Sequence, residues 1–280
     1  MQVKQIVGKL KNHDGLAYTF GRFRPVRGMY ASAMRCKQMF SAQSPIGTQE
    51  TIFPSVNTKA ALAELRRDAV CFGFDLTPEA AKIIYDYSCS QPLSHNSIAG
   101  TFNYSQVTGG KLPDGRMVAM GYVDKPLDCP VVRATVEDPK MQWVCRRYLG
   151  YVPLHVDVNL YWSFAAKLNL EERRKFNQTV EYHFDVHDFN FCYAHFYITD
   201  CDENSGAHVM VRGSHRHKKL SWLLGSARKG DAEVNAAYPA KDILVIKGRA
   251  GTGFIEDTSC YHKAIAPVER DRLLFQIRYH

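Results

Sequence analysis

The second half of the chain restricts its possible folds most strongly. After residue 150, short segments rich in strand-forming residues alternate with turns that contain Asn, Gly, Pro or Asp. Seven or so short strands within about 130 residues are typical of a β-sandwich or jelly roll, so we predict a mainly β fold with flanking helices. The segments are HVDVNLYWSF, VEYHFDVHDF, CYAHFYITD, AHVMVRG, KDILVIKG, TGFIEDT and RLLFQIRYH.

The chain divides into three regions that we expect to form one structural domain. Residues 1–57 contain scattered glycines and prolines, which predict a basic arm with extended structure and loops. Residues 58–150 form a helical and irregular lead-in. Helical spacing in TKAALAELRRDAV, the N-cap Thr77 followed by Pro78, and the segment MQWVCRRYLG predict its helices. Residues 151–280 then form the β core.

The bulk composition is that of an ordinary globular protein. Hydrophobic residues make up 45% of the 280 residues, which is enough for a large buried core. There is no apolar run of about eighteen residues and no apolar core of a signal peptide, so we expect a cytoplasmic location. The eight cysteines include no C-x-x-C pair, which predicts reduced, mostly buried thiols instead of a zinc ribbon.

The positive charge of the chain is concentrated near its N-terminus. Residues 1–37 contain eight lysines and arginines and one aspartate, so they carry 8 − 1 = +7 of a net charge of +8. Such an arm could attract an anionic substrate, a lipid surface or nucleic acid. A solvated arm, or one paired with its own domain, is the simpler interpretation, since no nucleic-acid-binding motif accompanies the charge.

Two histidines and one aspartate are the candidate metal ligands. His183 and Asp185 are two residues apart, which puts both side chains on one face of a strand. His262 follows the sixth predicted strand and is the candidate third ligand. Two histidines and one carboxylate leave three positions of an octahedron open, which suits iron(II) that binds a bidentate cosubstrate and O₂. The spacing alone is weak evidence, because His155 and Asp157 share it.

Arg272 opens the last predicted strand, ten residues after His262. Its guanidinium fork matches a carboxylate, so it could hold the distal carboxylate of 2-oxoglutarate while the 2-oxo acid end chelates iron. Alternation along the strand predicts a partly polar row facing a cavity and an apolar row facing a second layer. The polar row is Arg272, Leu274, Gln276 and Arg278, and the apolar row is Leu273, Phe275, Ile277 and Tyr279.

Residues from about 155 to 280 resemble the phytanoyl-CoA dioxygenase family of iron and 2-oxoglutarate oxygenases. The similar stretches occur in the family's order and cover a little under half of the chain. They are VNLYWSF, YHFD, FYITDCDENSGAHVMVRGSH, GTGFIEDTSCYHKA and RLLFQIRY. One departure is Arg212, which stands where a proline is usual in a structural turn.

The resemblance implies a double-stranded β-helix, or cupin-like jelly roll, and a function. Iron(II) would be held by His183, Asp185 and His262, and the 2-oxoglutarate carboxylate by Arg272. Tyr193 stands where relatives often have another polar residue that touches the cosubstrate. Asp185 favours hydroxylation of a small organic substrate, or related oxidations, because relatives that halogenate have a small residue at that position.

Other polar residues near these positions have alternative interpretations. His187, Asp188 and His195 lie close enough in sequence to compete as ligands or to line the pocket. His215 and His217 belong to a short basic run that is more typical of a surface turn than of a catalytic site.

Two other functional classes fit parts of the pattern. A cupin-like isomerase or hydrolase would keep the fold and the metal without 2-oxoglutarate, although Arg272 argues against it. A non-catalytic module tethered by its basic arm to nucleic acid or a membrane would depend on electrostatics alone. The sequence identifies neither the substrate nor the oligomeric state.

Overall fold

The strands form two antiparallel sheets in the computed structural model, which describes residues 13–40, 50–186 and 188–280. The smaller sheet has the order β10-β7-β8, and its strands are His208–Val211 (β7), Ile243–Ile246 (β8) and His262–Ala264 (β10). The larger sheet has the order β1-β9-β6-β11-β5-β4-β2-β3. Its strands are Val70–Phe72 (β1), Leu93–His95 (β2), Ile98–Phe102 (β3), Met120–Val123 (β4), Val156–Ser163 (β5), Cys192–Tyr197 (β6), Gly253–Glu256 (β9) and Arg272–Tyr279 (β11).

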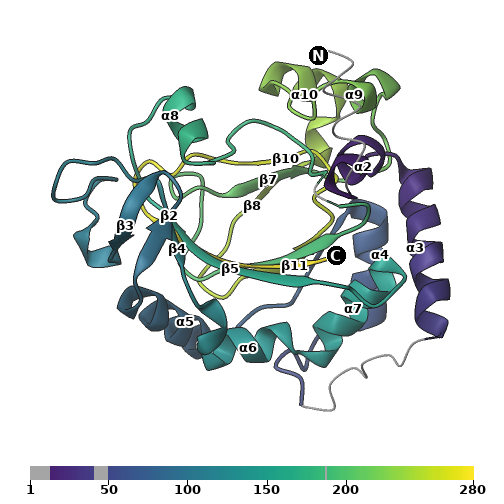
Figure 1. Cartoon of the computed structure of the whole chain (residues 1–280), viewed down its shortest axis with the longest axis horizontal. Helices are drawn as coiled ribbons and strands as arrows, with labels where there is room; N and C mark the ends of the chain where they lie inside the picture. The colour runs from purple at the N-terminus through teal and green to yellow at the C-terminus, as the bar shows by residue number, and fades with distance from the viewer. Residues whose placement is uncertain (1–12, 41–49, 187) are drawn as a thin grey trace.

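Helices cover the outer face of the larger sheet, and the smaller sheet faces its other side (Figure 1). This arrangement confirms the predicted mainly β fold with flanking helices. The helices are His13–Phe20 (α2), Arg24–Met39 (α3), Thr58–Asp68 (α4), Pro78–Ser90 (α5), Pro130–Val136 (α6), Pro139–Leu149 (α7), Leu170–Lys175 (α8), Leu220–Leu224 (α9) and Asp231–Ala237 (α10), with short 3₁₀ turns at Tyr104–Gln106, Pro126–Asp128 and Ala240–Asp242. In the described part of the chain, every helix is too short or too polar to span a bilayer.

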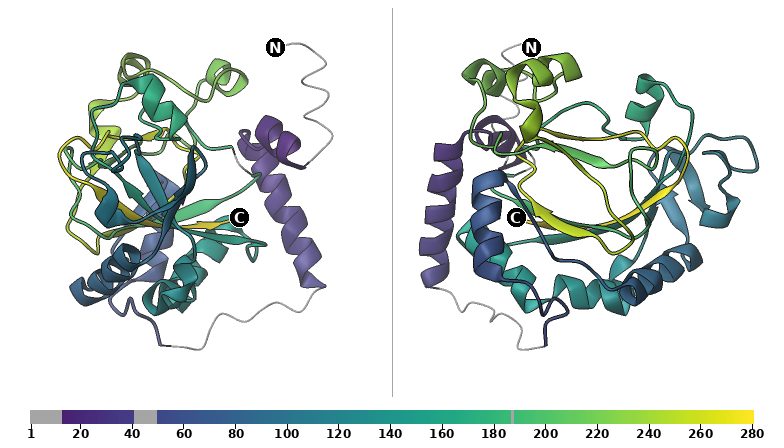
Figure 2. Two further views of the ribbon diagram at one scale, coloured as in Figure 1. Left: turned by 60° about the vertical axis from the view of Figure 1, so that its left-hand side comes forward. Right: turned by 180° about the vertical axis from the view of Figure 1, so that it is seen from behind.

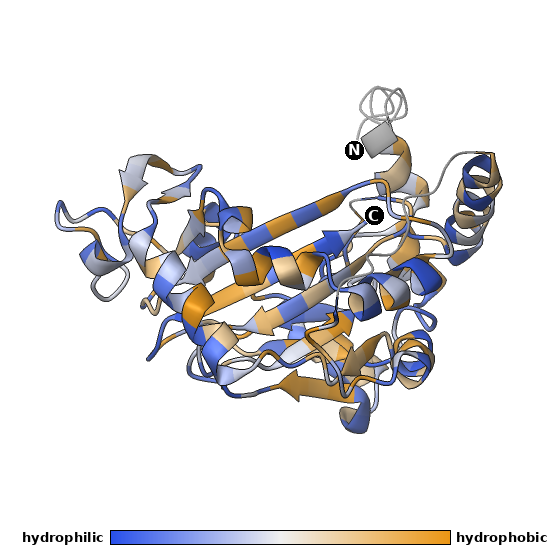
Figure 3. Cartoon of the chain, turned by 90° about the horizontal axis from the view of Figure 1, so that it is seen from below, coloured by the Kyte–Doolittle hydropathy of each residue, from blue (hydrophilic) through white to orange (hydrophobic). Residues whose placement is uncertain are grey.

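Strand β11 lies in the middle of the larger sheet and separates the core from the cavity. It pairs with β5 from Arg272 opposite Ser163 and with β6 from Leu274 opposite Tyr197. The predicted apolar row is buried in the main hydrophobic cluster against the helices, and Phe275 within it is fully buried. Figure 3 shows the alternation of hydrophobic and hydrophilic residues along the long strands. This alternation, with Arg272 turned to the cavity side, confirms the prediction for this strand.

The predicted helices of the lead-in are confirmed. Thr77 accepts a hydrogen bond from the Ala80 N–H with Pro78 in the first turn, and the segment MQWVCRRYLG belongs to α7. All eight cysteines lie within the described residues as free thiols, and six of them are buried.

The N-terminal region differs from its prediction, because α3 occupies Arg24–Met39 where loops were expected. Pro25 lies in the first turn of this helix, where the missing N–H costs nothing, so it starts the helix instead of breaking it. Helix α3 stands beside α4 and α7 (Figure 2), and Gln38 is hydrogen-bonded to both the N–H and the C=O of Val152. Tertiary contacts therefore stabilise a helix that local sequence patterns do not reveal. The rest of the predicted basic arm, residues 1–12, lies outside the described residues.

The segment 180–189 is also different from its prediction as a regular strand. Within its described part, the pairing is a bridge between His183 and His262 and a bridge between Tyr182 and Lys229. The segment extends the smaller sheet beside β10 over one residue pair, and beyond that pair the Asp185 N–H donates to the Thr258 carbonyl. A short bridge is enough to fix the two candidate ligands without a full strand.

The N-cap of α4 provides a test of local stability. Asn57 accepts hydrogen bonds from the N–H groups of Lys59 and Ala60, both at 3.1 Å. We expect Asn57→Ala to lower the free energy of unfolding by about 1 kcal/mol, because these donors lose their partner. Urea denaturation measures the change, and Asn57→Asp, which keeps the accepting oxygen, should be close to wild type. An equal loss in both variants would contradict the capping role.

Candidate metal and cosubstrate site

The three predicted metal ligands lie together. One ligand atom each from His183, Asp185 and His262 can be chosen so that all three lie within 4.8 Å of one another. The His183 Nε2 atom is 3.7 Å from Asp185 Oδ1, and the His262 Nε2 atom is 4.0 Å from Asp185 Oδ2. Two imidazole nitrogens and a carboxylate therefore converge on one point from two segments of the chain.

Backbone hydrogen bonds fix the two segments that carry these ligands. His183 and His262 exchange both of their backbone N–H···O=C hydrogen bonds, at 2.9 and 2.8 Å. The Asp185 N–H donates to the Thr258 carbonyl at 2.8 Å. The spacing of the candidate metal ligands is thus set by pairing between residues 183–185 and the segment that leads into β10.

Each histidine is oriented by its other ring nitrogen. The Nδ1–H of His183 donates to the Glu181 carbonyl at 3.0 Å, and the Nδ1–H of His262 donates to the Cys260 carbonyl at 3.1 Å. These contacts assign the proton to Nδ1 and leave Nε2 as the electron-pair donor, as in metal-binding histidines. Burial lowers the pKa of both imidazoles, which favours the neutral form that binds a cation. The donor set therefore fits a divalent transition metal.

Arg272 lies in the same cavity as the three ligands. The cavity has a volume of about 240 Å³, and its wall includes His183, Asp185, His262 and Arg272. The Arg272 side chain is buried, with 5% of its residue surface exposed. Its guanidinium donates to the Gly206 carbonyl and, at 3.3 Å, to Ser163 Oγ, while its Nε has no partner. Among the described residues no carboxylate lies within ion-pair distance of this cation.

Tyr193 lines the cavity but already has a partner. Its hydroxyl interacts with Arg278, which also forms an ion pair with Asp157. Burial is the main cause that raises the pKa of Tyr193, so the phenol stays protonated. Arg278 is therefore neutralised within the protein, whereas Arg272 is not. The role of Tyr193 toward a cosubstrate remains a prediction.

The other candidates near the triad have different surroundings. Asp188 is 2.8 Å from Nδ1 of His280, and Asp157 of the first H-x-D copy also contacts His280 at 3.2 Å. Neither belongs to the metal-ligand cluster. His195 lines the cavity without belonging to the ligand triad, and His187 lies outside the described residues.

Two further residues of this region, His208 and Glu256, were not singled out from the sequence. His208 on β7 lines the cavity, and its Nε2 lies 2.7 Å from Oε2 of the fully buried Glu256 on β9. The rings of His208 and His262 are stacked with centroids 5.5 Å apart. Burial raises the pKa of Glu256 and lowers that of His208. The sequence signal that could have found them is a histidine in β7 and a glutamate in β9, each the polar residue of an otherwise apolar strand.

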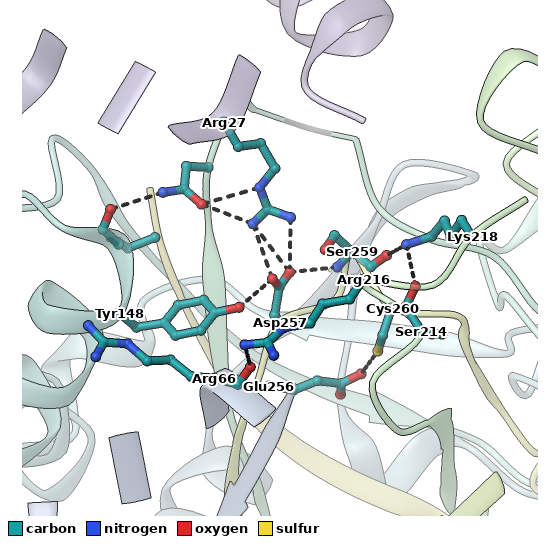
Figure 4. A network of polar contacts seen from close by, with 12 residues as sticks. Arg27, Arg66, Tyr148, Ser214, Arg216, Lys218, Glu256, Asp257, Ser259 and Cys260 are labelled. Atoms are coloured by element: carbon teal, nitrogen blue, oxygen red, sulfur yellow. Dashed lines mark hydrogen bonds and ion pairs between the residues drawn. The ribbon is translucent and has the colours of Figure 1, made fainter. Parts of the chain in front are cut away.

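The loop between β9 and β10 connects the candidate ligand His262 to a second polar network, which Figure 4 shows in close-up. Asp257 in this loop contacts Arg27 at 3.2 Å, the Tyr148 hydroxyl at 2.5 Å and the Ser259 N–H at 2.9 Å. Burial alone would raise the pKa of Asp257, but the Arg27 charge and these hydrogen bonds hold it well below its usual range. Part of the predicted basic arm is therefore paired with its own domain.

His215 gives this region a predicted pH dependence. Burial, opposed by Asp257 and reinforced by the charges of Arg216, Lys218 and Arg27, lowers its pKa from 6.5 to about 4. The unfolded chain takes up a proton as the pH falls below 6.5 and the folded chain does not, so stability is lost between pH 6.5 and 4.

We expect this residue to contribute roughly 2–3 kcal/mol of the acid loss in the free energy of unfolding. Urea denaturation at pH 7 and pH 4 measures it. The loss should be smaller in His215→Gln and unchanged in His217→Gln, whose side chain is exposed. An acid loss of wild-type size in His215→Gln would contradict the prediction.

Comparison with known proteins gives matches of structure only, since no family model and no curated protein matches the sequence. The epimerase SnoN, in complex with Fe³⁺, alpha ketoglutarate and nogalamycin RO, is 16% identical, with coverage of 79% of this chain and 82% of SnoN and a TM-score of 0.51. HygX from Streptomyces hygroscopicus, with nickel and 2-oxoglutarate bound, is 14% identical, with coverage of 80% and 87% and a TM-score of 0.52. The chain therefore has the jelly-roll fold that these two proteins share.

Proposed function

We propose that this protein is a non-haem iron(II) enzyme that uses 2-oxoglutarate and O₂ to oxidise a small organic substrate. The observation that carries the proposal is the buried guanidinium of Arg272, which has no carboxylate partner among the described residues and lies in the same cavity as the ligand triad. A buried cation without a counter-charge is costly, and a dicarboxylate cosubstrate supplies that charge.

The ligand set supports a metal with open coordination positions. His183, Asp185 and His262 would hold iron(II), and Arg272 would bind the distal carboxylate of 2-oxoglutarate. When bound, iron(II) and 2-oxoglutarate supply the O₂-dependent oxidation of a substrate C–H bond, with release of succinate and CO₂. The protein's own residues orient the cosubstrate through Arg272, and the buried half of the cavity wall limits the access of water.

Hydroxylation is our proposed outcome of this oxidation. It is supported by Asp185, whose carboxylate occupies the third ligand position. SnoN, which shares the fold, is an epimerase, so the fold accommodates other outcomes of the same cofactor set. The phytanoyl-CoA dioxygenase family remains our proposal for the family, on the basis of the ordered motifs between residues 155 and 280. A cytoplasmic location and an anionic substrate remain proposals that follow from the composition and the basic N-terminal region.

A cupin-like isomerase or hydrolase is the alternative that keeps the metal. The experiment that separates the two is anaerobic addition of iron(II) and 2-oxoglutarate to the purified protein. We expect the weak visible metal-to-ligand charge-transfer band that arises when 2-oxoglutarate chelates iron. Asp185→Ala should lose the band because it removes the carboxylate ligand.

The matched control for this experiment is Asp188→Ala. Asp188 is three residues from Asp185 and is paired with His280, away from the ligand cluster, so its loss should leave the band in place. Iron binding without the band in the wild-type protein would exclude the 2-oxoglutarate enzyme and support the cupin-like alternative. Loss of the band in both variants would point to a general structural effect.

A further inference from the structure

A second cavity lies on the opposite side of the β9–β10 loop from the cavity that contains His262. It has a volume of about 410 Å³ and lies among α3, α4, α7 and the turn after β7. Its lining includes six arginines and one carboxylate, Asp257. The arginines are Arg24, Arg27, Arg35, Arg66, Arg147 and Arg216.

Most of this positive charge is not neutralised within the described structure. Arg27 is paired with Asp257, but no other arginine of the set forms an ion pair with a described carboxylate. Arg66 and Arg35 donate to the carbonyl oxygens of Arg147 and Gly150, at 2.9 and 3.0 Å. These contacts orient the guanidinium groups and leave their charge available to a ligand.

Part of the cavity wall is buried and contains a polar atom without a hydrogen-bond partner. His215 lines the cavity with 8% of its surface exposed, and its Nδ1 atom has no hydrogen-bond partner. Arg27 is buried to the same degree and fixes Asp257 beside it. A buried polar group without a partner is rare in folded proteins and indicates a ligand or water at that place.

Gly28 keeps one side of the cavity open. It lies within α3, where glycine is unfavourable, and a Cβ atom built on it would meet no atom within 4 Å. Gly28 lines the cavity, so its missing side chain leaves room for a ligand. A side chain introduced here would enter that space without disturbing the packing.

We propose that this cavity binds a small molecule through a phosphate or pyrophosphate group. Guanidinium groups from α3, α4, α7 and the turn after β7 surround one hollow, and a phosphate presents acceptor oxygens in several directions, whereas a carboxylate presents two. The volume is that of a small-molecule site, and the concave shape distinguishes it from a flat basic surface. The site is separate from the proposed oxidation chemistry and does not depend on it.

The proposed site adjoins the metal site through one loop. Asp257 lines the arginine-rich cavity. The next residue, Thr258, lines the first cavity, and its carbonyl accepts a hydrogen bond from the Asp185 N–H. A ligand on one side of this loop therefore contacts a segment that positions a metal ligand on the other side.

Isothermal titration calorimetry of the full chain with inorganic pyrophosphate tests the proposal. Without added metal or 2-oxoglutarate, the result is independent of the oxidation reaction. We expect saturable binding of one equivalent, at least tenfold tighter than that of sulfate at equal ionic strength. Gly28→Glu should abolish it by filling the cavity with a negative charge, and Arg147→Gln, an exposed position, should weaken it at least tenfold.

Two variants are controls for folding and for general charge. Gly28→Ala adds a side chain too small to block the cavity and should keep wild-type binding. Lys111→Gln removes an exposed positive charge outside the cavity and should also bind like wild type. Binding no tighter than that of sulfate, or equal binding in wild type and Gly28→Glu, would overturn the proposal. Tighter binding of a single-stranded oligonucleotide, lost in Gly28→Glu, would overturn the assignment to a small molecule.

Discussion

Replacement of Arg272 by leucine is expected to raise the 2-oxoglutarate concentration needed for half-saturation by roughly 30-fold or more, while iron binding stays unchanged. Loss of one partner of a buried charge pair costs about 2–5 kcal/mol, which corresponds to this range. The charge-transfer band, titrated with 2-oxoglutarate under anaerobic conditions, measures the change.

The structure offers graded and matched controls for this prediction. Arg272→Lys keeps the charge but loses the planar fork, so its effect should be intermediate. Arg278→Leu removes an arginine from the same row of β11, but one that is already paired with Asp157, so the affinity for 2-oxoglutarate should change little. Equal affinity in wild type and Arg272→Leu would show that another residue anchors the cosubstrate.

Arg272→Leu also has an expected effect on the protein without cosubstrate. The guanidinium is buried with no ion-pair partner among the described residues, so its removal eliminates an uncompensated charge. We therefore expect the free energy of unfolding to be unchanged or higher in this variant. Lower stability would mean that the hydrogen bonds to Gly206 and Ser163 outweigh the cost of burial.

Asp257→Ala is expected to lower the free energy of unfolding by about 3–5 kcal/mol, because it leaves Arg27 as a buried, uncompensated cation. Asp257 is 2% exposed and Arg27 is 8% exposed, so the pair is shielded from bulk solvent although both residues line the arginine-rich cavity. The Tyr148 hydroxyl and the Ser259 N–H lose their acceptor as well. Such a loss is a large fraction of the stability of a typical domain.

Urea denaturation tests this prediction with two further variants. Asp86→Ala removes an exposed acid that pairs with Lys82 on α5, and it should cost no more than about 0.5 kcal/mol. The double variant Arg27→Met/Asp257→Asn removes the buried charge along with its partner and should recover much of the loss. A loss below about 1 kcal/mol in Asp257→Ala would contradict the importance of this pair.

The mutual position of the candidate metal ligands could be inferred in part from the sequence, because short-range periodicity determines how His183 and Asp185 are oriented. A spacing of two residues places His183 and Asp185 on one side of any extended segment, and the structure keeps this arrangement although the segment is not a regular strand. Alternation in the last strand likewise placed Arg272 on the cavity side. These inferences need only the local geometry of an extended chain.

Features that depend on long-range contacts could not be predicted in this way. Helix α3 has a glycine within it, and it is stabilised by contacts with residues more than 100 positions away, such as Val152 and Asp257. The pairing of His208 with Glu256 depends on how β7 and β9 face each other across the two sheets. No periodicity in a single segment reports such contacts.

The position of β11 in the sheet has a consequence for tolerance to insertions and deletions. One residue deleted within this strand would turn every later side chain to the opposite face, so that polar residues would enter the core and aromatic residues the cavity. The segment between β10 and β11, residues 265–271, has no regular structure and can change length more freely. Natural variation in length should therefore accumulate before Arg272 and be almost absent after it.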